Sequence, residues 1–319
     1  MATSLIDRRA LPSGAQVRRW AAPDGWEMRV LDWPAAGPSP RGSILFQAGR
    51  GDMFEKYLES LAHWQAQGWH VTSFDWRGQG GSGRCTDAGG CGHIDDYGRY
   101  VADLRAFHAD WAASTPGPHV VMGHSMGGHL VLRALAEGGI APDAAVLVAP
   151  MLGFRPGIFG PFAEHAAKIM GGLGDTARPA WKGNEKPYTT TTRNTLLTHD
   201  SDRYADEIWW QMHQPALLTG PPSWRWVIEG FRSMRELRGD PRLAGITTPV
   251  LMLVATHDRL IDSRAGLRLA PRLPDCRLVT FGPESAHEIL READAVRDRA
   301  LGEIDAFLGE RAPRSGLRP

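Results

Sequence analysis

The chain has 319 residues, of which 42% are hydrophobic, and this suits an α/β domain that carries an insertion. Lys and Arg together number 36, as do Asp and Glu, so the net charge of zero gives no electrostatic reason to expect binding to nucleic acid or to an anionic membrane. Residues 1–19 hold no apolar run of signal-peptide length, and the longest apolar runs, 144–152 and 250–255, are too short to span a bilayer. We therefore expect a soluble, cytoplasmic protein.

The first half of the chain alternates short apolar segments with amphipathic ones. Strands are predicted at 16–20, 26–33, 43–47, 69–74, 119–122 and 144–148, and helices near 57–64, at 96–113 and at 127–137. Such alternation indicates a mostly parallel sheet covered by helices on both faces. In sheets of this kind the functional groups lie at the carboxyl ends of the strands.

The rhythm breaks between residues 150 and 240, where no buried strand is evident. This stretch predicts helices at 161–170, 204–218 and 223–237; beyond it come strands at 249–255 and 276–281 and helices at 262–272 and 284–308. The predicted organisation is a core of residues 1–150 and 241–309, a helical cap of residues 151–240 and a flexible tail of residues 310–319. A cap at the carboxyl ends of the strands would cover the groups placed there.

A serine enclosed by glycines, Gly123-His124-Ser125-Met126-Gly127, joins a short strand to a helix. Small residues two positions before and after the serine let strand and helix approach closely, and the sharp turn raises the Ser125 hydroxyl above the sheet edge. The Met126 N–H then lies in the first turn of a helix, where donors are unpaired and negative charge is favoured. The pattern predicts a nucleophile beside an oxyanion site; the alternative is a glycine-rich connection with an idle serine.

A serine nucleophile needs a base, and the base needs an acid to orient it. Asp258 follows the strand at 250–255 and His287 follows the strand at 276–281, which gives the chain order serine, acid, histidine of elbow-type hydrolases. We assign Asp258 as the acid and His287 as the base. Asp258 could instead be a turn residue and His287 could merely open the last helix, while Asp262 is read as a helix N-cap.

Two further loops carry candidate groups. The glycines around Arg50 let its N–H turn toward the serine as a second oxyanion donor, although the loop could also be a plain glycine turn. Cys85 and Cys91 share one loop and are read as free thiols, with a local disulfide as the alternative; zinc is disfavoured because ligands at metal spacing are missing.

Four motifs together resemble the α/β hydrolase superfamily. They are Gly-His-Ser-Met-Gly-Gly at 123–128, Asp-Trp-Arg-Gly-Gln-Gly-Gly-Ser-Gly at 75–83, His-Asp-Arg-Leu-Ile-Asp at 257–262 and Ala-His-Glu-Ile-Leu-Arg-Glu at 286–292. Within that superfamily they are similar to the monoacylglycerol lipase and lysophospholipase branch, which is also described as serine aminopeptidase-like. Many relatives have a His-Gly pair before the oxyanion residue, where this chain has Ala48-Gly49. The Gly-Arg form at residues 49–50 is closer to the lysophospholipases.

The resemblance covers about residues 26–309. It implies an eight-stranded, mostly parallel sheet with helices on both faces and a helical cap after the sixth strand. It also implies a triad of Ser125, Asp258 and His287, oxyanion amides at Arg50 and Met126, and no metal or organic cofactor.

We therefore expect a serine hydrolase that cleaves a carboxylic ester, a monoacylglycerol or a lysophospholipid, through an acyl-enzyme. A peptidase, an acyltransferase or a cofactor-free haloperoxidase would share the triad, and a receptor could keep the fold without turnover. Aromatic and methionine residues of the cap exceed what its packing needs, and we expect some of them to line a slot for the acyl chain: Met151, Phe159, Trp209, Trp210 and Trp226. The cap could also touch a membrane or micelle surface transiently; the sequence leaves the oligomeric state open.

Overall fold

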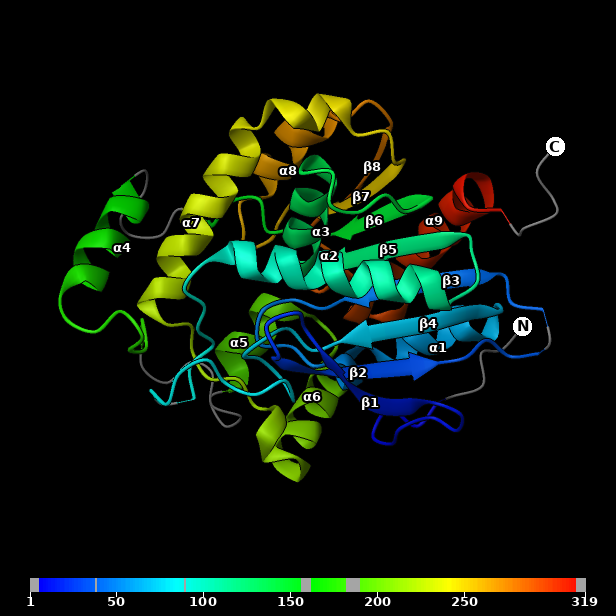
Figure 1. The fold of residues 1–319 in the computed structure, drawn as a ribbon, viewed down its shortest axis with the longest axis horizontal. Coiled ribbons are helices and arrows are strands. Elements are labelled where there is room, and N and C mark those ends of the chain that lie inside the picture. The colour runs from blue at the N-terminus through cyan, green and yellow to red at the C-terminus, as the bar shows by residue number, and fades with distance from the viewer. Residues whose placement is uncertain (1–5, 38, 89, 156–161, 182–189, 314–319) are drawn as a thin grey trace.

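The sheet has eight strands in the order β1-β2-β4-β3-β5-β6-β7-β8 (Figure 1). The computed structural model describes residues 6–37, 39–88, 90–155, 162–181 and 190–313. The strands are β1 Gln16–Ala21, β2 Glu27–Trp33, β3 Gly42–Gln47, β4 Trp69–Phe74, β5 His119–His124, β6 Ala144–Val148, β7 Val250–Ala255 and β8 Cys276–Phe281. Strand β2 is antiparallel to β1 and to β4, and all the other pairings are parallel. This is the mostly parallel eight-stranded sheet that the sequence predicts.

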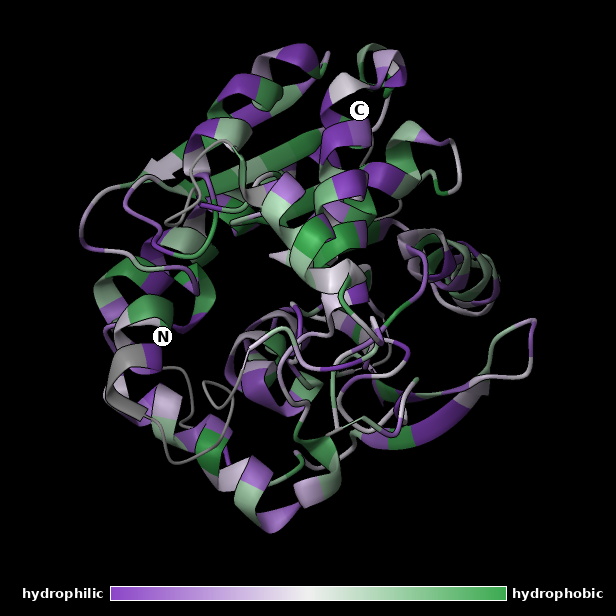
Figure 2. Cartoon of the chain, turned by 90° about the vertical axis from the view of Figure 1, so that its left-hand side faces the viewer, coloured by the Kyte–Doolittle hydropathy of each residue, from purple (hydrophilic) through white to green (hydrophobic). Residues whose placement is uncertain are grey.

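Helices cover both faces of this sheet. They are α1 Leu58–Ala66, α2 Tyr97–Ser114, α3 Met126–Ala136, α8 Ser263–Leu269 and α9 Asp294–Arg311. Helix α2 crosses the front of the sheet in Figure 1, whereas α9 lies behind it. Every residue of β3, β6 and β7 is buried, as expected for central parallel strands that are shielded on two sides. Hydrophilic and hydrophobic residues alternate along most helices, which is the pattern of helices with one face on a core (Figure 2).

Between β6 and β7 the chain leaves the sheet and forms an insertion of four helices within the part that the structure describes. These are α4 Ala163–Gly172, α5 Thr190–Leu197, α6 Ser201–His213 and α7 Trp224–Gly239. Helices α4 and α7 project on the side toward which the arrowhead of β4 points, so they lie beyond the carboxyl ends of the parallel strands (Figure 1). Helix α6 ends before the predicted residue 218 because Pro215 cannot continue it, and a short 3-10 turn follows.

The predicted helix at 284–308 is wrong at its start. Residues 282–293 form a loop with one 3-10 turn at Ile289–Arg291, and α9 begins only at Asp294. Backbone groups of this loop are bonded elsewhere, since the Ala286 N–H donates to the Glu292 carboxylate and the Glu288 N–H to the carbonyl of Leu197. At its other end α9 runs through Arg311, so the predicted tail begins too early; residues 314–319 lie outside the described residues.

Among the helices that the structure describes, none is both long enough and apolar enough to cross a membrane.

Candidate active site

Ser125 lies at the turn between β5 and α3 in a strained backbone conformation, with φ of 51° and ψ of −116°. A Cβ atom at Gly123 would lie 2.6 Å from the backbone of Gly127, and one at Gly127 would lie 2.4 Å from the carbonyl oxygen of Gln47. Only glycine fits at either position, which explains the two glycines that the motif places around the serine.

Hydrogen bonds hold the peptide groups of Ser125 on both sides. Its N–H donates to the carbonyl of Val148 at 3.0 Å. Its own carbonyl accepts from the N–H of His129 at 3.0 Å and from the N–H of Met151 at 2.9 Å. The turn is therefore bonded to the end of β6, to α3 and to the first residues of the insertion.

Three side chains from separate segments meet at this turn. The Nε2 atom of His287 lies 2.8 Å from Ser125 Oγ, and its Nδ1 atom lies 2.5 Å from Asp258 Oδ2. The other oxygen of Asp258 accepts from the N–H groups of Leu260 at 2.7 Å and Ile261 at 3.0 Å. With its Nδ1–H donated to Asp258, the imidazole presents an Nε2 lone pair to the serine hydroxyl. This arrangement can remove a proton from Ser125.

The electrostatics of the three groups favour charge separation between His287 and Asp258. Burial lowers the pKa of His287, but the Asp258 carboxylate outweighs burial and raises that pKa above its usual value. Burial raises the pKa of Asp258, yet the charge and hydrogen bond of His287 and two backbone N–H groups hold it below its usual value. The pair therefore stabilises an imidazolium that forms when the serine gives up its proton.

The neighbouring candidates have other roles. Asp262 caps α8, because its side chain accepts from the Arg264 N–H at 3.1 Å, as the sequence suggests. His257 is exposed and contacts Thr256. His129 is fully buried and contacts Ser233 Oγ at 2.7 Å. None of these three can replace His287 or Asp258 at the serine.

The loop after β3 packs directly against the serine turn. A Cβ atom at Gly49 would lie 3.2 Å from Ser125 Cβ, so this position also requires a very small residue. The Arg50 guanidinium donates to the carbonyl of Gly220 at 3.2 Å and lies 5.7 Å from the ring centre of Trp226. Met126 is the first residue of α3. The roles of the Arg50 and Met126 amides as oxyanion donors stay predictions.

A cavity of about 650 Å³ opens above Ser125. One wall is apolar and belongs mainly to the insertion; its residues include Met151, Phe154, Met170, Trp226, Phe231 and Ile261. The other wall is charged, with Asp52, Lys56, Arg193 and Glu288. Ser125 and His287 line the same cavity as both sets of residues, so apolar and charged side chains share one cavity with the reacting atoms.

Two tryptophans that the sequence assigns to this cavity lie elsewhere. The Trp210 indole donates to the carbonyl of Arg8 at 2.8 Å, and the Trp209 ring stacks on His213 with centroids 4.0 Å apart. Neither is among the residues that line the cavity, and Trp210 instead contacts the N-terminal segment. Phe159, also assigned to the slot, lies outside the described residues.

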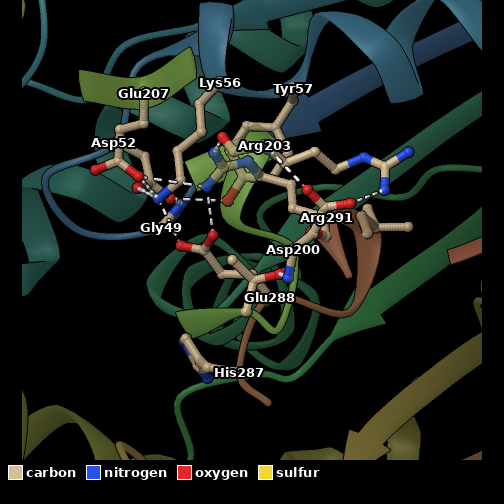
Figure 3. Close-up of polar contacts among 12 residues, drawn as sticks. Gly49, Asp52, Lys56, Tyr57, Asp200, Arg203, Glu207, His287, Glu288 and Arg291 are labelled. Carbon is tan, nitrogen blue, oxygen red and sulfur yellow. Dashed lines mark hydrogen bonds and ion pairs between the residues drawn. The ribbon is translucent and has the colours of Figure 1, made fainter. Parts of the chain in front are cut away.

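The charged wall is the part of the site that the sequence reasoning missed. Lys56 and Glu288 lie in a buried cluster of ionised side chains beside His287 (Figure 3). The spacing of Asp52 and Lys56, four residues apart, and the position of Glu288 directly after the predicted base were the available signals.

Cys85 and Cys91 are free thiols. Over the ranges that the structure describes, no three His, Cys, Asp or Glu side chains gather in a way that could hold a metal ion.

Comparison with known proteins places these features in a family. The model of the family described as "Serine aminopeptidase, S33" matches residues 38–294. Lysophospholipase L2 of Escherichia coli is 32% identical over 298 residues, which cover 86% of this chain and 82% of that protein. Monoacylglycerol lipase of Mycolicibacterium smegmatis is 31% identical over 268 residues, which cover 83% and 88%.

A solved structure agrees in fold. It is a soluble variant of monoglyceride lipase from Saccharomyces cerevisiae in complex with a substrate analogue, with a TM-score of 0.76, 17% identity and coverage of 94% of this chain and 97% of that one. At 17% identity, this similarity shows a shared fold and nothing beyond it. Because the family model spans most of the sequence and the two relatives are more than 30% identical over more than four fifths of their length, the chain belongs to the serine aminopeptidase S33 family of α/β hydrolases.

Proposed function

We propose that this protein hydrolyses the ester of a single-chain lipid, a lysophospholipid or a monoacylglycerol, through an acyl-enzyme. That it is a carboxylic ester hydrolase follows from its relatives, which are lysophospholipases and monoacylglycerol lipases. The observation that carries the mechanism is the contact of His287 Nε2 with Ser125 Oγ at 2.8 Å, on the floor of a cavity with an apolar wall.

The reaction proceeds in two halves. His287 takes the proton of Ser125 while Oγ attacks the ester carbonyl, and Asp258 stabilises the imidazolium. The N–H groups of Arg50 and Met126 hold the oxyanion, which collapses as the alcohol leaves with the proton from His287. Water, deprotonated by the same imidazole, then attacks the acyl-enzyme and releases the fatty acid.

The cavity supports a substrate with one acyl chain. Its volume of about 650 Å³ lies within the range of pockets that enclose a small ligand. The apolar wall formed by residues such as Met151 and Trp226 suits an alkyl chain, and the charged wall suits a polar alcohol. In the cap of residues 151–240, Phe162, Ile169 and Leu173 on and beside α4 are exposed by 66% or more, and this supports a transient contact with a lipid aggregate.

The test is a substrate panel with the native protein and a Ser125→Ala variant. We expect a fluorophosphonate to label the native protein alone, and we expect turnover of graded p-nitrophenyl esters, of monoacylglycerol and of lysophosphatidylcholine. A protein that is labelled but cleaves only aminoacyl substrates would be a peptidase, and one that transfers the acyl group to an added alcohol in preference to water would be an acyltransferase. Absence of labelling would leave a ligand-binding homologue.

A further inference from the structure

A buried ammonium group lies at the centre of the charged wall. Lys56 belongs to a 3-10 turn, Phe54–Tyr57, that directly follows the loop carrying Arg50. Its side chain is 1% exposed, and its Nζ atom lies 2.6 Å from Asp52, 3.0 Å from Glu207 and 2.5 Å from Glu288 (Figure 3). An ammonium has three N–H donors, and three carboxylates surround this one. Lys56 donates hydrogen bonds to Asp52 and Glu288 and forms an ion pair with Glu207, so its ammonium is held by three carboxylates of the protein.

Among the described residues, the cluster holds equal numbers of cations and carboxylates. Arg291 forms ion pairs with Glu288 and with Glu207, and Arg193 contacts Glu207 at 2.7 Å, so three cations face three carboxylates. Burial lowers the pKa of Lys56, but the carboxylates around it raise that pKa above its usual value. Burial raises the pKa of Glu207, yet the cations lower it to about 2. Lys56 and Glu207 thus stay ionised near neutral pH, and the loss of the ammonium would leave buried charge uncompensated.

Each carboxylate belongs to a different part of the site. Asp52 follows Arg50, and its second oxygen accepts from the Gly49 N–H at 3.1 Å and from the Tyr57 hydroxyl at 2.8 Å. Glu288 directly follows His287, and Glu207 lies on α6 of the insertion. One ammonium therefore joins the loop of the predicted oxyanion donor, the loop of the base, and the insertion.

A second path runs from the same cluster to the base. The Tyr57 hydroxyl lies 2.8 Å from Nδ1 of His124, and Nε2 of His124 lies 3.3 Å from the carbonyl oxygen of His287. The rings of His124 and His287 are tilted against each other, with centroids 4.8 Å apart. The backbone of His287 is thus linked to Asp52 through His124 and Tyr57, and to Lys56 through the neighbouring Glu288.

We propose that Lys56 is a positioning residue for the hydrolase, fixing the loop at Gly49 to Asp52 against the loop at His287 and Glu288. The proposal rests on the proposed function, because both loops matter only if Ser125 reacts. Misplacing a reacting group by about 1 Å can cost about 100-fold in rate, so the effect of losing the ammonium falls on turnover.

The experiment compares Lys56→Met with Arg77→Met. Arg77 is also a buried cation; it pairs with Asp24 and Asp103 and not with the three carboxylates around Lys56. Active serines are titrated with a fluorophosphonate, and p-nitrophenyl butyrate hydrolysis is expressed per titrated serine. We expect Lys56→Met to lower kcat about 30- to 100-fold with KM within about 3-fold of the native value, and Arg77→Met to leave both within about 2-fold.

The outcomes separate the possible roles. If Lys56 has a purely structural role, Lys56→Met will reduce the titrated fraction but leave kcat per titrated serine unchanged. If Lys56 binds substrate, the variant will raise KM and keep kcat. Either result overturns the proposal, as does an equal loss of kcat in Arg77→Met. If Lys56→Met does not fold, Glu207→Gln replaces it. We expect this variant to lower kcat about 3- to 10-fold, and an unchanged kcat would again overturn the proposal. A native protein that is neither labelled nor active refutes the proposed function instead, whatever the variants do.

Discussion

The imidazole of His287 and the hydroxyl of Ser125 are 162 positions apart in the chain, and their Nε2 and Oγ atoms lie 2.8 Å from each other. Removing the hydroxyl tests the contact directly. Ser125→Ala is expected to lower ester hydrolysis at least about 1,000-fold and to abolish fluorophosphonate labelling, because no other atom supplies the nucleophile. Circular dichroism should show an unchanged fold, so retention of the native rate would exclude Ser125 as the nucleophile.

The pH profile should report the ionisation of His287. The base acts only when neutral, so kcat/KM falls as the pH drops below its pKa, and the Asp258 carboxylate raises that pKa above the usual value of 6.5. The acidic limb should therefore have its midpoint above pH 6.5. Asp258→Asn removes the charge, so the limb should move to lower pH while kcat falls about 100- to 10,000-fold. Asp262→Asn is the control, and an equal shift in that variant would contradict the assignment of Asp258.

The glycines around the serine should be intolerant of any side chain. A Cβ atom at Gly127 would meet the Gln47 carbonyl at 2.4 Å, so Gly127→Ala should lower the free energy of unfolding by about 2–4 kcal/mol and depress activity. Gly302→Ala is the matched control, since nothing lies within 4 Å of its Cβ position and it lies in α9. There alanine should stabilise by up to about 1 kcal/mol, because glycine is the poorer helix former. Urea unfolding measures both, and equal effects would refute the steric argument.

Acyl-chain preference should depend on the cavity wall and not on α6. Trp226 lines the cavity, whereas Trp209 stacks on His213 away from it. Trp226→Ala enlarges the cavity at its apolar wall, so the preferred p-nitrophenyl ester should have a longer acyl chain. The ratio of kcat/KM for long esters to kcat/KM for short esters is expected to rise about 10-fold. Trp209→Ala should keep the native profile. If the two variants behave alike, the apolar wall is not the acyl site.

The thiols in the loop after β4 should be inert. Burial raises the pKa of Cys85 to about 11 and also raises that of Cys91, so neither forms a thiolate near neutral pH. We expect slow labelling of both by iodoacetamide in the folded protein, fast labelling in urea, and a melting temperature that dithiothreitol does not change. A fall in melting temperature on reduction would indicate a disulfide.

Local patterns predict most of the fold. The strands at 69–74, 144–148 and 276–281 agree with the structure at both ends, because a short apolar run between turn residues has few other uses in an α/β chain. The approach of Ser125, Asp258 and His287 is also foreseeable, since each follows a parallel strand and the carboxyl ends of those strands share one edge.

Elements whose surroundings come from distant segments are not foreseeable in this way. Helix α5 was missed because Thr190–Leu197 has little apolar periodicity, and the start of α9 was misplaced because residues 284–293 bond to Leu197 and to one another. Trp210 has a largely apolar side chain, but its indole N–H donates to the carbonyl of Arg8, about 200 positions away. The Lys56 cluster draws on three distant segments, and spacing along the chain cannot reveal such a meeting.

The carbonyl of Ser125, which accepts from both His129 and Met151, sets a limit on exchanging the insertion between relatives. The Met151 N–H, at the start of the insertion, donates to the carbonyl of Ser125 itself. A graft that begins before Met151 therefore changes a hydrogen bond that holds the nucleophile in place. Chimaeras joined after Gly153 keep that support and transfer only the wall above it. A chimaera joined just after Gly153 should therefore change the substrate range and keep the catalytic geometry, whereas one joined before Met151 should change both.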